Sequence, residues 1–125
     1  MQEYKEFMDT VSKEERLDFN DNQLKIIYAK YLKRDLDGNV VETPLGMFKR
    51  IAKEIARPDS MYKEPDKVRQ LEQEFLDMMT SLDFLPGGRT MANAGTPVKN
   101  LANCFVIPVQ DSMEGIFEAV KKAAL

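Results

Sequence analysis

Two stretches of the sequence place their apolar residues three and four positions apart, the spacing that lines one face of an α-helix. The first begins at Thr43-Pro44, since Thr is a preferred N-cap and Pro a preferred first helical residue, and it ends before Arg57-Pro58. The second spans about 66–82. The residues expected to face inward are Met47, Phe48, Ile51, Ala52 and Ile55 in the first, and Val68, Leu71, Phe75, Met78, Met79 and Leu82 in the second. These faces predict a mostly α-helical fold.

A further helix is predicted upstream, after the capping residues Asn20-Asp21-Asn22 and ending near Lys33-Arg34. Its buried face would hold Leu24, Ile27, Tyr28, Tyr31 and Leu32. Residues 1–15 are polar and predict a weak helix or a frayed tail. Residues 35–39 predict an Asp-Gly turn rather than a calcium loop, because Gly46 occupies the place of that loop's final acidic residue.

The C-terminal third changes character. Residues 84–97 are rich in turn-forming and small residues, whereas 104–109 predict a short buried strand. A last helix is expected from Asp111, with Asp111 and Glu114 spaced as a capping box. The whole chain would then have three or four helices and one strand. It stops inside that helix without a stop signal, so we expect one piece of a longer or split protein.

Composition narrows the chemistry. The sequence contains no His and one Cys, Cys104, so it offers no Ser-His pair, no internal disulfide and no thiolate or His metal site. Its net charge is −3 with both signs mixed, which is not typical of a surface for polymeric nucleic acid. There is neither an apolar run of membrane length nor a secretory signal, so a cytoplasmic location is expected.

The stretch 84–113 carries what functional signal there is. Its Gly, Ala, Asn and Thr residues would let the backbone approach a ligand and would supply polar partners for it. The alternative is a loop that only has to turn sharply before a strand. Residue chemistry by itself favours the turning loop.

The same stretch, with Asn93-Ala94-Gly95-Thr96-Pro97, then Cys104 opening a strand and then Asp111-Ser112, resembles the entry to the barrel of ribonucleotide reductase catalytic (large) subunits. The passage from Tyr31-Leu32 through 37–44 is also similar, and the resemblance runs from about residue 20 to the end. It implies a helical N-terminal domain, 1–83, followed in 84–125 by a substrate loop, the first strand and a truncated first helix of a ten-stranded α/β barrel.

The resemblance implies roles for particular residues. Cys104 would be one of two redox-active thiols that reduce the ribose 2′ position and become a disulfide; a lone Cys is otherwise usually a small buried hydrophobe. Gly88, Thr90 and Asn103 would lie along the substrate with Cys104. Many relatives carry Ser in place of Asn103 and a hydroxyl residue in place of Gly88, so contacts there would be through the backbone.

The resemblance also implies regulation. Asp111, Ser112 and Met113 correspond to a specificity site for a deoxynucleoside triphosphate effector, although Asp111 and Ser112 also suit a helix cap. The implied partners are a ribonucleotide substrate, the effector, the rest of the barrel, a thioredoxin-like reductant and a second copy of the complete enzyme. Deoxyribonucleotide synthesis for DNA replication would be the biological role.

Two questions of class remain open at this point. Residues 85–89 and 103–105 are more similar to adenosylcobalamin-dependent reductases than to diiron-dependent large subunits, with no cofactor-contacting residue identified. The radical-carrying Cys of the family has no counterpart here, so this chain alone is expected to be inactive. The alternative of a different kind is a non-catalytic helical module that pairs with another chain through its last helix.

Overall fold

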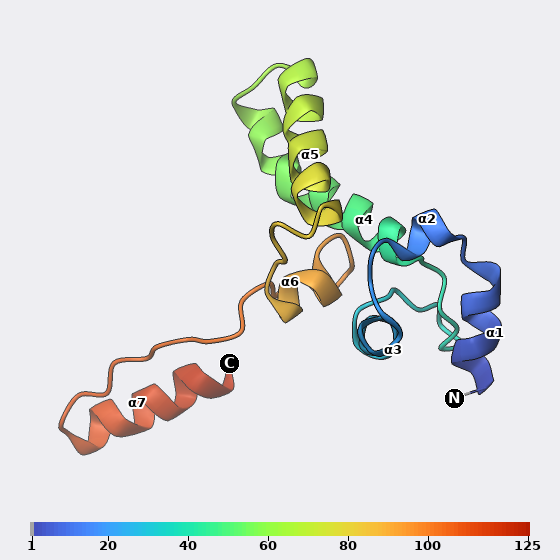
Figure 1. Ribbon diagram of the computed structural model, residues 1–125. Coiled ribbons are helices and arrows are strands. Elements are labelled where there is room, and N and C mark those ends of the chain that lie inside the picture. Colours follow the sequence, from blue (N-terminus) through green and yellow to red (C-terminus); the bar gives the residue numbers. More distant parts are fainter. Residues whose placement is uncertain (1) are drawn as a thin grey trace.

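The computed structural model describes residues 2–125, and within them it is helical (Figure 1). This confirms the predicted mostly α fold, but the structure has more than the three or four helices that were expected. The seven α-helices are α1 (Gln2–Thr10), α2 (Lys13–Arg16), α3 (Asp21–Lys30), α4 (Pro44–Ala56), α5 (Pro65–Thr80), α6 (Gly88–Asn93) and α7 (Met113–Ala124), and a 3-10 helix, η1, spans Arg57–Met61. The additional helices are the short ones, α1, α2 and α6, whose apolar patterns are weak.

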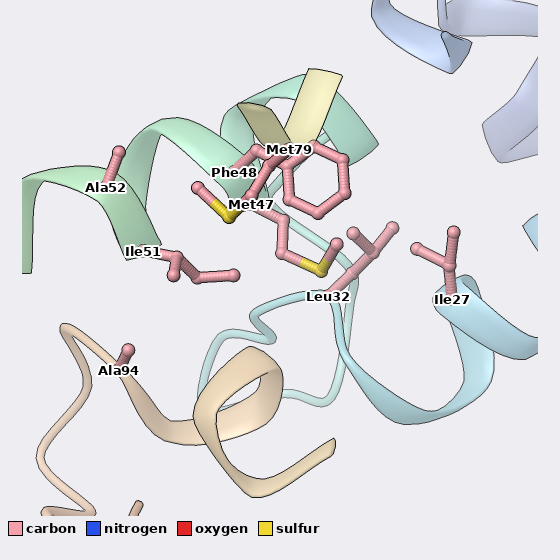
Figure 2. Packing of buried hydrophobic residues seen from close by; sticks show 8 residues of the cluster. All are labelled: Ile27, Leu32, Met47, Phe48, Ile51, Ala52, Met79 and Ala94. Atoms are coloured by element: carbon pink, nitrogen blue, oxygen red, sulfur yellow. The ribbon is translucent and has the colours of Figure 1, made fainter. Parts of the chain in front are cut away.

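Helix α4 forms the centre of the core. The Thr43 side chain accepts a hydrogen bond from the Gly46 amide at 3.1 Å and Pro44 follows it, as the sequence predicts for a helix start. Met47 and Phe48 are fully buried in the cluster of eight residues shown in Figure 2. Ile55 is the exception to the predicted face, because it is 37% exposed and Ala56 is buried instead.

Helix α5 packs along α4 but buries less than its pattern predicts. Of the six residues expected to face inward, Met79 alone is buried, while Met78 remains 37% exposed. The reason is that α5 has α4 and η1 as its packing neighbours and lies open on its other sides. The amphipathic pattern therefore predicted the helix correctly but overestimated how much of it is buried.

The N-terminal residues were expected to form a weak helix or a frayed tail; they form the helix α1, whose buried residues belong to a second, smaller cluster. Tyr4, Met8 and Val11 pack with Leu24 of α3. The Tyr4 hydroxyl donates to the Asp21 carboxylate at 2.9 Å, which ties α1 to the start of α3. That start is as predicted, because Asn20 caps α3 in a reciprocal capping box with Gln23.

The predicted turn at 35–39 is present. The Asp35 carboxylate accepts hydrogen bonds from the backbone amides of Asp37 and Asn39 at 3.0 and 2.8 Å, and Gly38 takes a positive φ of 88°. Hydrogen bonds from Asn39, through its backbone and then its side chain, hold the pKa of Asp35 below its usual value. The acidic residue here organises a turn.

The predicted buried strand at 104–109 is not formed. Residues 101–110 are extended but have no β-strand partner in the part of the chain described, and Phe105 and Val106 are 67% and 97% exposed. An extended segment needs a neighbouring strand for its backbone groups and a second layer for its side chains. Figure 1 shows this segment leading away from the helical body to α7, which lies apart from the other helices.

Candidate functional site

The residues expected at the substrate are built around the short helix α6. Its first turn is Gly88-Arg89-Thr90, a helical turn where the sequence predicted a loop. The Thr90 hydroxyl donates to the carbonyl of Leu101 at 3.2 Å, and the Asn93 amide group donates to the carbonyl of Asn100 at 2.7 Å. Two α6 side chains therefore hold the chain as it returns after the loop.

That return is produced by the small-residue loop 94–98. The Thr96 hydroxyl donates to the Asn93 carbonyl at 2.8 Å and accepts from the Val98 amide at 3.2 Å. Gly95 has a φ of +70°, and a Cβ on it would lie 2.8 Å from Cγ of Arg50. The small residues here let the backbone approach Arg50, whereas the sequence interpretation had them approach a ligand.

The loop brings the expected substrate residues together at the start of α6. The Asn103 side-chain nitrogen lies 3.9 Å from where a Cβ on Gly87 would be, so Asn103 lies beside the start of α6. A Cβ on Gly88 would lie 3.3 Å from the phenol oxygen of Tyr31, which places that ring beside the turn. The Cys104 thiol is exposed, not buried as the predicted strand required.

The expected effector residues lie elsewhere. Asp111, Ser112 and Met113 are exposed at the start of α7, beyond the extended segment (Figure 1). The Ser112 hydroxyl accepts from the Gly115 amide at 3.0 Å, so Ser112 is the N-cap of α7. The predicted capping box of Asp111 with Glu114 is therefore wrong by one residue, and Asp111 has no part in the cap.

Sequence reasoning missed the charged pair behind the loop, Glu42 and Arg50. Arg50 Nε and Nη2 donate to the two Glu42 carboxylate oxygens at 2.8 and 2.9 Å, and the side chains are 10% (Glu42) and 11% (Arg50) exposed. The backbone amide of Lys33 also donates to Glu42, at 3.1 Å. The available signal was position: Arg50 follows Met47 by three residues and so flanks the buried face of α4.

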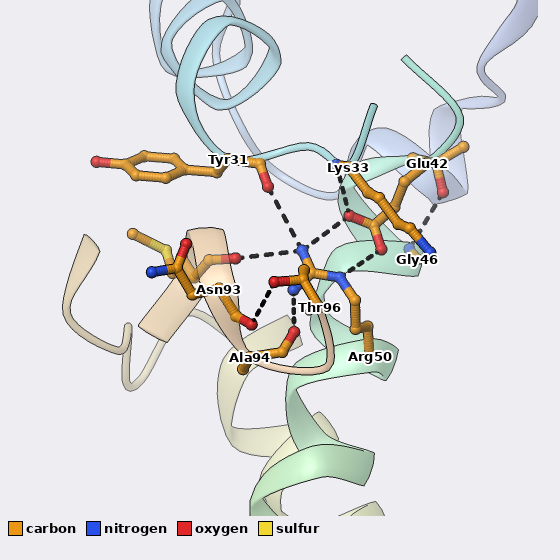
Figure 3. Close-up of polar contacts among 10 residues, drawn as sticks. Tyr31, Lys33, Glu42, Gly46, Arg50, Asn93, Ala94 and Thr96 are labelled. Carbon is orange, nitrogen blue, oxygen red and sulfur yellow. Dashed lines mark hydrogen bonds and ion pairs between the residues drawn. The ribbon is translucent and has the colours of Figure 1, made fainter. Parts of the chain in front are cut away.

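Arg50 reaches further than its partner (Figure 3). Its Nη2 donates to the carbonyls of Met91 and Tyr31 at 3.2 and 3.4 Å, and its Nη1 donates to the carbonyl of Ala94. The guanidinium group thus contacts backbone from the end of α3, from α6 and from the loop. It joins the segments that surround the expected substrate residues.

An apolar groove of about 390 Å³ opens beside this arrangement, between α4, α5 and residues 84–90. Its lining includes Ile55, Phe75, Met78 and Phe84, with Thr90 at one edge. Such a lining does not suit a charged nucleotide, because phosphates need polar or cationic partners. Gly87 and Thr90 belong both to this lining and to the turn at the start of α6, so the groove adjoins the expected substrate residues.

No group of three or more His, Cys, Asp or Glu side chains in residues 2–125 is arranged to hold a metal ion. No helix there is both long enough and apolar enough to cross a membrane.

Comparison with known proteins gives consistent results. Residues 17–99 match the family described as "Ribonucleotide reductase, all-alpha domain". The chain is 30% identical, over 83% of its length, to the vitamin B12-dependent ribonucleoside-diphosphate reductase of Thermoplasma acidophilum, and 33% identical, over 79%, to the protein of that name from Mycobacterium tuberculosis. It is 33% identical, over 96%, to the ribonucleoside-diphosphate reductase subunit alpha of Helicobacter pylori. It spans 21%, 14% and 15% of the length of these three relatives.

Proposed function

The chain belongs to the ribonucleotide reductase large-subunit family, and from this premise we propose that it supplies the helical domain and the substrate loop of an enzyme that reduces ribonucleotides to deoxyribonucleotides. The observation that carries the proposal is the return of the chain to α6, where the Asn103 side chain lies beside Gly87 and the Thr90 hydroxyl donates to the Leu101 carbonyl. The family match does not favour the alternative of a non-catalytic helical module. The division into 1–83 and 84–125 and the cytoplasmic location stay predictions.

In this proposal Gly88, Thr90 and Asn103 contact the ribonucleotide. Gly88 packs against Tyr31, so a larger residue at position 88 would contact the phenol ring and fill the space at this turn. The Thr90 hydroxyl already donates to Leu101, which leaves its oxygen as an acceptor for a substrate hydroxyl. Asn103 is exposed in the extended segment, and its contact with the substrate would be through the backbone, as for Gly88.

Cys104 would supply one of the two thiols that act as reductant. Two thiols lose two electrons and two protons as a disulfide forms. The ribose C2′–O bond breaks, the hydroxyl leaves with one proton as water, and the two electrons and the other proton form the new C2′–H bond. The second thiol would come from another part of the enzyme, because Cys104 is the single Cys in this sequence. An exposed thiol suits this role, since a thioredoxin-like protein must afterwards reduce the disulfide.

Asp111, Ser112 and Met113 would contact a deoxynucleoside triphosphate that selects the substrate. The Asp111 carboxylate can accept a hydrogen bond from the deoxyribose hydroxyl, and the first turn of α7 presents backbone amides. They lie at the start of α7, which is apart from α6 in Figure 1, so the proposed effector site is separate from the proposed substrate residues. A homodimer of the complete enzyme belongs to the same proposal.

The radical cofactor we propose is adenosylcobalamin, since two of the relatives are named vitamin B12-dependent. A relative named only as a subunit alpha keeps the diiron-dependent class as the second candidate. No residue of this chain is proposed to contact the cofactor. Its contribution would be to bind substrate and to donate a thiol.

The test is an activity assay on a complete reductase that carries this segment. With a ribonucleotide, a dithiol reductant and adenosylcobalamin, we expect a 2′-deoxyribonucleotide product. Product that forms only when a diiron partner subunit replaces the cobalamin would move the enzyme to the second class. No product under either condition would contradict the proposed function.

A further inference from the structure

We infer that Arg50, held in place by Glu42, is a positioning residue for the substrate loop, an inference that rests on the proposed function. Arg50 itself touches none of the proposed substrate residues. It acts through the backbone on which they are mounted.

The three carbonyls that Arg50 binds mark the three segments of the proposed site. Tyr31 ends α3 and places its ring against Gly88. Met91 directly follows Thr90 in α6. Ala94 opens the loop that returns the chain to Asn103. One guanidinium group therefore sets the relative positions of the three segments.

The chemistry of the pair fits positioning better than simple stabilisation. Taking two charges out of water is costly, and a well-packed apolar pair often serves a scaffold as well or better. Here the guanidinium uses both edges, with Glu42 on one and backbone carbonyls on the other (Figure 3). A Lys has one point of charge and cannot present donors in that fixed fork.

The loop is shaped to receive Arg50. Gly95 combines a left-handed backbone with the 2.8 Å approach of its hypothetical Cβ to Arg50 Cγ, so a side chain at 95 would push the loop off the arginine. Ala94 is 1% exposed and anchors the loop in the same core as Met47. The conformation of the loop and the position of Arg50 thus each depend on the other.

Another ion pair on this chain offers a matched control. Arg57 and Glu54 pair at 2.8 Å near the end of α4, but the Arg57 side chain is 71% exposed and the pair spans three residues. Arg57→Lys makes the same chemical change as Arg50→Lys without involving the loop.

The first measurement is amide hydrogen exchange on the 125-residue chain. Arg50→Lys should raise exchange at Ala94 and Thr96 by about tenfold or more while α5 keeps its protection, because opening of the loop alone is a local event. Gly95→Ala should loosen the same amides from the loop side, with the α4–α5 contact untouched, and it carries the test if Arg50→Lys does not fold. Arg57→Lys should match the wild type. Equal loss of protection in α5, or no change at Ala94 and Thr96, would overturn the inference.

The second measurement separates positioning from loss of folded protein in a complete reductase. If the loop is in place only about a tenth of the time, KM for the ribonucleotide rises about tenfold, since apparent affinity falls with the competent fraction. Saturating substrate restores the loop, so kcat should stay within about twofold. Less folded enzyme would instead lower apparent kcat at unchanged KM, and that result, or wild-type kinetics, would overturn the inference. Failure of the proposed function is recognised separately, by a wild-type reductase that forms no product.

Discussion

At the scale of single residues, Cys104 bears the proposed chemistry most directly. Its thiol is exposed, one residue after Asn103, whose side chain lies beside the start of α6. In a complete reductase, Cys104→Ser should abolish multiple turnover with dithiol reductants, because Ser has nearly the same shape but cannot form the disulfide that accepts two electrons. Substrate affinity, measured by equilibrium binding, should stay within about twofold of the wild type, since the backbone and Asn103 contacts remain. Sustained turnover in this variant would rule out the redox role.

Asp111 offers a cleaner experiment than its sequence position indicates. Since Ser112 caps α7, Asp111→Asn should leave the helix intact. A hydrogen bond to a charged group contributes roughly 1.5–3 kcal/mol, so losing the charge should weaken deoxynucleoside triphosphate binding by about tenfold or more. Effector affinity and its influence on substrate choice would be measured on the complete reductase.

The neighbouring residue is the control for that variant. Ser112→Ala removes the cap from the Gly115 amide and should destabilise α7 by about 1 kcal/mol. Amide exchange in α7 distinguishes the two variants. If Asp111→Asn left effector affinity unchanged, Asp111 would have no role in that site.

At the scale of helices, the contact between α1 and α3 gives a pH dependence. Burial, the hydrogen bond to Asp21 and its negative charge raise the pKa of Tyr4 from 10.0 to about 12. The folded state therefore holds the phenol proton more tightly than the unfolded state. The resulting stability is present in full below pH 10 and is lost as pH rises towards 12.

The variant that tests this is Tyr4→Phe, which removes the titrating group and also one hydrogen bond, worth about 1 kcal/mol at neutral pH. The free energy of unfolding, measured in urea, should fall more steeply between pH 10 and 12 for the wild type than for Tyr4→Phe. A tyrosine absorbance titration should lose its component near pH 12 in the variant. Parallel pH profiles for the two proteins would contradict the assignment.

Helices also show how far the sequence could be interpreted. Features that depend on residues within one or two helical turns were predictable. These are the helix start at Thr43-Pro44, the apolar face that begins with Met47 and Phe48, and the Asn20 cap. The burial of Val68 and Phe75 was overestimated, since periodicity shows which face is apolar but not what covers it. Helix α6 was missed because six residues carry too little pattern.

The candidate site was likewise predictable only in part. That Gly88, Thr90 and Asn103 lie together was expected from resemblance, and their roles stay a prediction. The carbonyl contacts of Arg50 could not be predicted, because two of the three acceptors lie 41 and 44 residues further along the chain. Such contacts depend on how whole segments pack, which no local pattern records.

At the scale of the whole molecule, the chain exposes an unusual amount of apolar surface towards its C-terminal end. Val106 is 97% exposed, Phe105 67% and Phe117 of α7 64%. Exposed backbone edges and contiguous apolar side chains favour association. The isolated chain should therefore self-associate as its concentration rises, which sedimentation velocity would show as a concentration-dependent increase in mass.

Charge placed within that surface should reduce the effect. Val106→Lys combined with Phe117→Lys should shift the chain towards monomer. Val41→Lys is the matched control, because Val41 is 56% exposed but lies in a different part of the molecule, before α4. A wild-type chain that stays monomeric at every concentration would contradict the expectation.

The way Arg50 grips the loop also bears on which mutations the protein can tolerate. Every amino acid brings a backbone carbonyl, so no substitution at Tyr31, Met91 or Ala94 can delete the acceptor that Arg50 uses. The course of the loop depends on residue identity mainly at Glu42, Arg50 and Gly95, and on a small side chain at the buried Ala94. Side chains that face the substrate can then change during evolution, and new substrate specificities can arise while the loop keeps its conformation.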